Sequence, residues 1–91
     1  MGPTALATSC MFGKEDAAEI LIRLGASVDL ADSEGMTPLH FAVLGGHTRI
    51  VQLLLRSGAK TSLANEFGDT AADLAKASTS EIQQVFESAR L

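Results

Sequence analysis

The feature that most constrains this chain is an internal repeat with a period of 33 residues. Glycine recurs at Gly2, Gly35 and Gly68, and a threonine follows two residues after each of them. The same offset aligns Gly25-Ala26 with Gly58-Ala59. A unit of this length cannot bury a hydrophobic face alone, so it must stack on similar neighbours. The sequence therefore predicts a linear array of alike units.

The first half of the central unit predicts a short helix. Thr37 is a good N-cap, and Pro38 suits the first helical position because its missing N–H would have had no partner there. Apolar residues follow at helical spacing from Leu39 to Val43. Gly46 is placed to end the helix, since glycine adopts a left-handed conformation without a Cβ penalty.

The second half of the central unit predicts another helix, with apolar residues from Ile50 to Leu55 and Gly58 as its stop. These apolar residues cover most of the helix circumference, so the helix should be flanked on more than one side, as in the middle of a stack. Between helix pairs, stretches such as Gly25 to Met36 contain turn formers and acids. They predict hairpin-like loops.

The central unit resembles an ankyrin repeat. The segment Gly35-Met36-Thr37-Pro38-Leu39-His40-Phe41-Ala42 is followed by Gly46-His47 and by Gly58-Ala59, which are signature positions of that family. The resemblance covers essentially the whole chain and implies an all-α solenoid of stacked antiparallel helix pairs joined by hairpin-like loops. It also implies structural roles for Thr37, Pro38, Leu39, His40, Gly46 and Gly58, with His40 hydrogen-bonding back toward Thr37.

We expect a single domain over residues 1–91, with repeats at about 2–31, 32–64 and 65–91. The flanking repeats lack the proline and histidine of the central one, and terminal repeats are expected to be atypical because one face meets water. The last helix has an apolar stripe including Ile82 and Phe86, opposed by polar residues, which is typical of a C-terminal cap. At the other end two interpretations stay open: the first helix pair is its own cap, or the chain is a piece of a longer array.

Composition excludes several classes of partner. The formal net charge is −4 and the seven Lys and Arg are scattered, so a phosphate backbone would be repelled and nucleic acid is not an expected partner. No apolar run approaches the roughly 18 residues that cross a bilayer. Cys10 is the single cysteine and cannot form an internal disulfide, which fits a reducing compartment. We expect an intracellular protein, cytoplasmic or nuclear, that is monomeric.

No constellation of residues predicts an enzyme, a metal site or a cofactor. Cys10 occupies the position of Val43 in the next repeat, on the packed face of a first helix, so a buried inert thiol is expected. His40 and His47 have no further ligands to complete a zinc site, which wants about four. No nucleophile lies beside a plausible base, and no glycine-rich loop ends in Lys-Ser or Lys-Thr.

Acids surround apolar residues in the two predicted hairpins. Glu34 lies beside Met36, and Glu66 and Asp69 flank Phe67. Large apolar residues that packing does not require usually indicate contact with another molecule. In ankyrin proteins the hairpin tips and first helices line a concave groove, which here would be acidic at the rim and apolar within. The residues implied for this face are Met11, Phe12, Ser33, Glu34, Met36, Leu44, Ala64, Glu66, Phe67, Asp69, Ala77 and Ser78.

Two functions remain as hypotheses. The first is a protein-interaction module that presents this face to a partner protein or peptide with basic and apolar groups. The second is a structural spacer, or a fragment of a longer array, with no ligand of its own. An enzymatic function is a distant third hypothesis, because the sequence shows no paired nucleophile and base.

Overall fold

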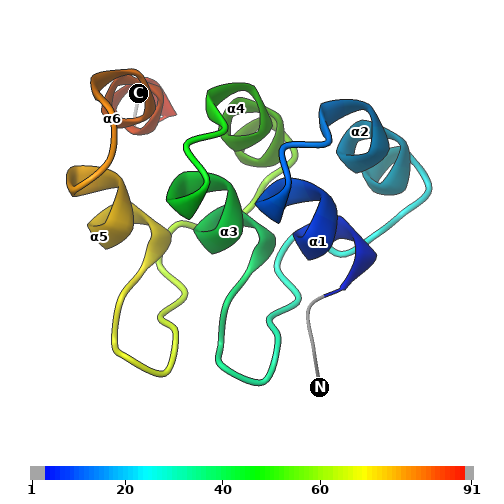
Figure 1. Cartoon of the computed structure of the whole chain (residues 1–91), viewed down its shortest axis with the longest axis horizontal. Helices are drawn as coiled ribbons and strands as arrows, with labels where there is room; N and C mark the ends of the chain where they lie inside the picture. Colours follow the sequence, from blue (N-terminus) through cyan, green and yellow to red (C-terminus); the bar gives the residue numbers. More distant parts are fainter. Residues whose placement is uncertain (1–3, 90–91) are drawn as a thin grey trace.

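The structure, a computed structural model, describes residues 4–89, so Gly2 of the predicted period lies outside it. Six helices follow one another in three pairs (Figure 1): α1 (Ala5–Met11) and α2 (Glu15–Arg23), α3 (Pro38–Leu44) and α4 (Thr48–Arg56), and α5 (Ala71–Lys76) and α6 (Ser80–Ala89). Within the described residues no strand forms, and the isolated antiparallel bridge between Ala64 and Thr70 closes one hairpin. The predicted all-α solenoid is confirmed.

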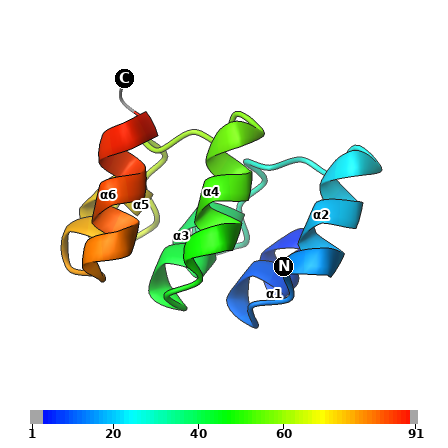
Figure 2. The same ribbon diagram turned by 90° about the horizontal axis from the view of Figure 1, so that it is seen from above.

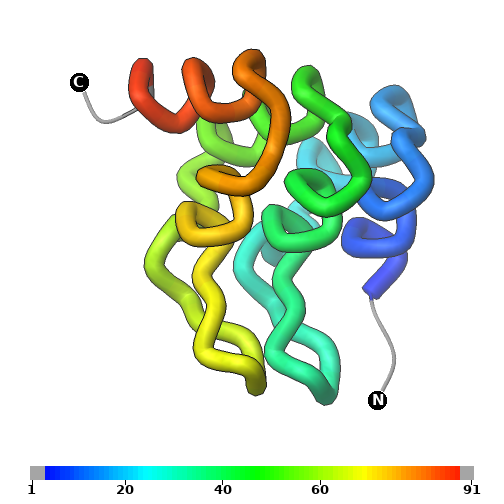
Figure 3. Tube along the Cα trace, turned by 60° about the vertical axis from the view of Figure 1, so that its left-hand side comes forward, coloured from blue at the N-terminus to red at the C-terminus, as the bar shows by residue number. Residues whose placement is uncertain are grey.

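The helices form two layers. The first helix of each pair (α1, α3, α5) lies in one layer and the second (α2, α4, α6) in the other, as Figure 2 shows from above. Two hairpin-like loops precede α3 and α5 and project side by side away from the helices (Figures 1 and 3). Each repeat therefore contributes one helix to each layer.

The first helices begin at threonine caps, as the sequence predicts. The Thr37 hydroxyl accepts a hydrogen bond from the His40 backbone N–H, and Pro38 is the first helical residue. Thr4 and Thr70 cap α1 and α5 in the same way. Gly46 and Gly58 have φ of 72° and 89°, the left-handed conformation that ends a helix at low cost for glycine. The local sequence thus determines both ends of the central helices.

A continuous core lies between the two layers. Helix α4 packs against α3, α2 and α6, which confirms that it is flanked on several sides. Its buried residues are Ile50, Val51 and Leu54. Burying side chains of this size stabilises the fold by roughly 1.5–3 kcal/mol each. The other buried apolar residues are contributed by every repeat: Leu6, Ala7, Cys10, Ala18, Leu39, Ala42, Val43, Ala59, Ala71, Ala75 and Ile82.

The two ends of the stack differ in polarity. On α6, Ile82 is buried while Gln83 and Glu87 are exposed, in agreement with the predicted polar cap. In the first repeat, by contrast, Ile20 on α2 is 55% exposed and Leu24, which directly follows α2, is 78% exposed. The second-helix layer therefore carries uncovered apolar side chains beside the first repeat and polar ones beside the last.

Candidate functional site

A buried histidine joins the central repeat to the next hairpin. His40 Nδ1 lies 3.1 Å from the backbone nitrogen of Thr37, and Nε2 lies 2.9 Å from the carbonyl oxygen of Asp69. Because a backbone N–H can only donate, Nδ1 accepts and the ring proton resides on Nε2, which donates to Asp69. The bond to Thr37 was expected. The bond to Asp69 was not predicted, and it fixes the second hairpin against α3.

Both hairpin tips are built around the same turn. Asp32 Oδ1 accepts hydrogen bonds from the backbone N–H groups of Glu34 and Met36, each at 2.9 Å. One period later, Asn65 Oδ1 accepts from Phe67 and Asp69 at 2.9 and 3.0 Å. An Asp or Asn side chain commonly stabilises a turn in this way. The carboxylate of Asp32 thus holds its own loop together.

The two hairpins are also bonded to each other. The Glu66 backbone N–H donates to the Glu34 carbonyl oxygen at 2.9 Å. Gly35, with φ of 77°, allows this approach, since a Cβ there would lie 2.9 Å from Asn65 Cα. The tips are therefore held at a fixed spacing, even though each is a loop.

Met36 departs from its expected position. We expected an apolar tip residue that packing does not require, but Met36 is half-buried and its sulfur accepts a hydrogen bond from Asn65 Nδ2 at 3.3 Å. The cause is the side-by-side arrangement of the two hairpins (Figure 3), which brings Asn65 of the second hairpin into contact with Met36 of the first. Met36 is thus a contact between repeats.

Other residues of the predicted face are well exposed. Phe67 is 72% exposed at the second hairpin tip, while Phe12 and Leu44 are 65% and 61% exposed at the ends of α1 and α3. Glu34 and Glu66 are exposed as well. Ser33, Ala64 and Ala77 share this exposure, whereas Met11, Asp69 and Ser78 are half-buried.

These residues fall into two patches on one layer of the molecule. Ser33, Glu34, Glu66 and Phe67 form the hairpin-tip patch, and Met11, Phe12, Leu44 and Ala77 form the helix-end patch. Along the central repeat the patches are separated by the end of the hairpin and by α3, whose rise from Pro38 to Leu44 alone is about 9 Å at 1.5 Å per residue. A partner that contacts both patches must therefore extend along the first helices.

A second histidine fits between the first two repeats. His47 Nε2 lies 3.1 Å from the Met11 carbonyl oxygen at the end of α1. A Cβ at Gly13 or Gly45 would come within 2.7 or 2.5 Å of the imidazole ring, so both glycines make room for it. This packing positions the helix-end patch of one repeat relative to the next.

Cys10 is fully buried in the core, and burial raises the pKa of its thiol to about 12. Such a thiol remains protonated and unreactive near neutral pH. Across residues 4–89, no three His, Cys, Asp or Glu side chains are grouped so that they could hold a metal ion. In the same part of the chain, every helix is too short or too polar to traverse a lipid bilayer.

The comparisons with known proteins agree with the fold. A family model described as ankyrin repeats in three copies matches residues 1–65. Human protein fem-1 homolog C is 42% identical over 65 residues, which cover 71% of this chain and 10% of that protein. The ankyrin repeat and LEM domain-containing protein 1 homolog of Caenorhabditis elegans is 40% identical over 74 residues, 81% of this chain and 10% of that protein.

A shorter relative aligns over nearly the whole chain. Mouse protein phosphatase 1 regulatory subunit 27 is 30% identical over 86 residues, which cover 94% of this chain and 56% of that protein. The chain thus spans about a tenth of the length of the first relatives and about half of this one.

Proposed function

Since this chain belongs to the ankyrin-repeat family, whose members generally serve as protein-interaction modules, we propose that it binds a partner protein or peptide through the hairpin-tip and helix-end patches. The partner would carry basic groups and apolar anchors. The chain would act by binding, without catalysis.

The observation that carries this proposal is the exposure of Phe67. Its ring lies at a hairpin tip beside Glu66 and contributes nothing to the core. A large apolar side chain left in water gains stability only when another surface covers it. Phe12 and Leu44 supply further apolar area at the helix-end patch.

Charge supports a basic partner. Glu34 and Glu66 are exposed at neighbouring tips, and a backbone hydrogen bond between these two residues places them side by side. Both attract a Lys or Arg on the partner. The net charge of −4 acts in the same direction at longer range.

Rigidity supports tight binding. The hydrogen bonds from Glu66 to Glu34 and from His40 to Asp69 order the second hairpin before any partner arrives. A surface that is already ordered loses little entropy on association, so more of the contact energy contributes to affinity.

The test compares proteins captured by the intact chain with those captured by Phe67→Glu. Leu24→Glu is the matched control, because Leu24 is equally exposed but lies after α2 in the other layer. We expect a partner that is retained by the intact chain and by the control and is lost with Phe67→Glu. Equal capture by all three proteins would contradict the proposed surface.

A structural spacer is the second candidate. It is favoured because this chain spans only about a tenth of the length of the first relatives. In that case the patches would bind nothing at micromolar concentration.

The remaining proposals concern the cellular location and the oligomeric state of the chain. The free buried thiol of Cys10 suits a reducing, intracellular environment. The net charge of −4 opposes self-association, so we propose a monomer.

A further inference from the structure

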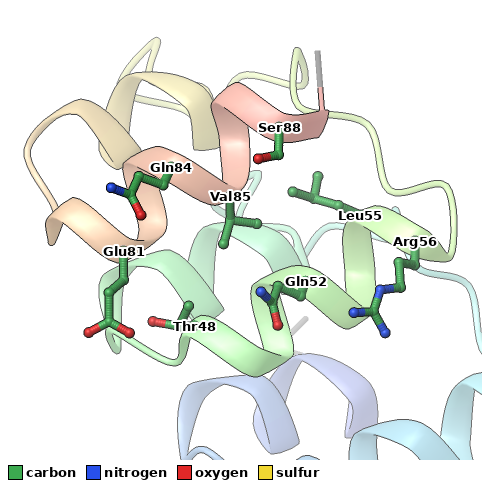
Figure 4. Close-up of a pocket in the computed structure, with 8 residues that line it drawn as sticks. All are labelled: Thr48, Gln52, Leu55, Arg56, Glu81, Gln84, Val85 and Ser88. Carbon is green, nitrogen blue, oxygen red and sulfur yellow. The ribbon is translucent and has the colours of Figure 1, made fainter. Parts of the chain in front are cut away.

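A groove of about 560 Å³ runs along the second-helix layer, between α4 and α6 (Figure 4). It faces away from the hairpins and contains none of the residues proposed above to bind a partner. We name it the outer groove. Its lining includes Gln52, Leu55 and Arg56 of α4 and Glu81, Gln84 and Val85 of α6.

Charge is separated along the outer groove. Glu81 lies beside Thr48 at the end where α4 and α6 begin, and Arg56 lies at the far end of α4, as Figure 4 shows. Both charged side chains are exposed. Within residues 4–89 no ion pair engages either of them. The groove therefore offers an acceptor for a basic group at one end and a donor for an acidic group at the other.

Between the charged ends, the groove combines an apolar floor with two amides. Leu55 and Val85 are half-buried and approach each other across it (Figure 4). Gln52 and Gln84 come from the two facing helices, and no hydrogen bond between described residues uses either side chain. Each amide supplies both a donor and an acceptor.

This combination selects an extended peptide over a helix. A helix satisfies its own backbone groups and offers none of them to the two glutamines, whereas an extended segment presents free N–H and C=O groups to them. A helix also needs a long apolar stripe, and the outer groove offers only Leu55 and Val85.

A second copy of this chain does not fit the groove. Two copies related by a two-fold axis would set one hollow against another, and an isologous contact needs self-complementary shapes. Each copy also carries a net charge of −4.

The length of the groove determines the spacing of the ligand's residues. Thr48 and Arg56 are the ends of the nine-residue helix α4, about 12 Å apart at 1.5 Å per residue. An extended peptide covers about 13 Å in four residues, and residues i, i+2 and i+4 share one face.

We propose that the outer groove binds an extended peptide segment of a partner protein that carries an acidic residue, an apolar residue and a basic residue at two-residue intervals on one face. The acid pairs with Arg56, the apolar side chain covers Leu55 and Val85, and the base pairs with Glu81. The peptide backbone bonds Gln52 and Gln84. This site is separate from the hairpin-tip and helix-end patches and does not depend on them.

The test uses seven-residue peptides with blocked ends as probes. Each peptide has a central valine and one charged residue two positions away on either side. Two peptides carry one aspartate and one lysine in opposite orders, and the comparison peptide carries lysine at both positions. Amide chemical shifts of the labelled 91-residue chain report both affinity and location. We expect one mixed-charge peptide to bind with a Kd on the order of 1 mM, which is reasonable for so small a contact, and to shift residues of α4 and α6.

The charge preference separates this site from general attraction to an acidic protein. Net charge alone would favour the double-lysine peptide, whereas the groove favours the mixed one. Arg56→Glu should weaken the mixed peptide by about threefold and strengthen the double-lysine peptide, as expected for an exposed ion pair. Arg49→Glu changes the net charge equally from an exposed position on α4 outside the groove, and should leave the preference between the peptides unchanged.

The proposal is overturned if no probe binds at several times that concentration, or if shifts appear at Leu44 and Phe67 instead. A preference of the intact chain for the double-lysine peptide, or shifts in α4 and α6 that follow protein concentration without peptide, would overturn it as well. Thermal unfolding of Arg56→Glu and Arg49→Glu confirms that both variants are folded.

Discussion

The imidazole of His40 donates a hydrogen bond across the repeat boundary to the carbonyl oxygen of Asp69, 2.9 Å away. The same ring accepts a hydrogen bond from the Thr37 backbone. One buried side chain therefore connects the start of α3 with the loop that precedes α5.

We expect His40→Ala to lower the free energy of unfolding by about 2 kcal/mol, because it leaves the buried Thr37 backbone N–H unpaired, removes one of the two hydrogen bonds to the Asp69 carbonyl oxygen and opens a small cavity. Urea denaturation measures the change. Arg49→Ala, at an exposed position, is the control and should have no effect beyond error. An unchanged denaturation midpoint for His40→Ala would contradict the structural role of the ring.

The close approach of the hairpins predicts a difference between two glycines. Both Gly35 and Gly68 have positive φ, but an added Cβ meets Asn65 Cα at 2.9 Å only at Gly35 and has open space at Gly68. Gly68→Ala should cost about 1 kcal/mol from backbone strain alone, and Gly35→Ala clearly more. Equal costs in thermal unfolding would show that the hairpins separate easily.

Hydrogen exchange should be slowest in α4. This helix is packed against α2, α3 and α6, whereas the terminal helices have fewer neighbours. Amide exchange followed by NMR gives the order of protection. If the best-protected amides were those of α1, from Leu6 to Cys10, the first repeat would be the stable end of the stack.

The buried thiol of Cys10 should make stability depend on pH above neutrality. Its pKa rises from 9.0 to about 12 on folding. The folded state thus retains a proton that the unfolded state loses, so this contribution is fully present below about pH 9 and disappears as the pH rises toward 12. Denaturant unfolding between pH 8 and 11 measures how far the free energy of unfolding falls. The fall should be smaller in Cys10→Ala. A parallel decline in the variant would assign the effect to other groups.

Acidic and apolar residues at the hairpin tips should act on different rate constants. Phe67→Ala should speed dissociation from the partner and leave the association rate within about threefold, because apolar anchors mainly determine residence time. Glu34→Gln with Glu66→Gln should slow association, most strongly at low salt, since these charges steer over a screening length of about 10 Å. Surface plasmon resonance at two salt concentrations separates the two effects. A change in the same rate constant for both variants would contradict this division.

Much of the fold is predictable from the local sequence. Thr37-Pro38 and Gly46 specify where α3 begins and ends, and the alignment of Cys10 with Val43 identifies a core position. These features depend on neighbours within one repeat, so the local sequence and the alignment of the repeats are sufficient to predict them.

Contacts between repeats were harder to predict. The cover over Met36 depends on how far one hairpin is displaced from the next, and the outer groove depends on the distance between α4 and α6. Neither quantity is encoded in a single residue or spacing. The glutamines at 52 and 84 gave no signal in the sequence, because isolated surface amides are common.

The turn shared by the two hairpins has a consequence for how this family member could diversify. Asp32 and Asn65 build equivalent tips with the same oxygen acceptor, so the geometry accepts either side chain. An Asn65→Asp substitution would keep the oxygen acceptor of the turn, remove the hydrogen bond that Asn65 Nδ2 donates to Met36 and add one negative charge. The charge of the hairpin edge can therefore change through a single side-chain group at a turn position that accepts either residue.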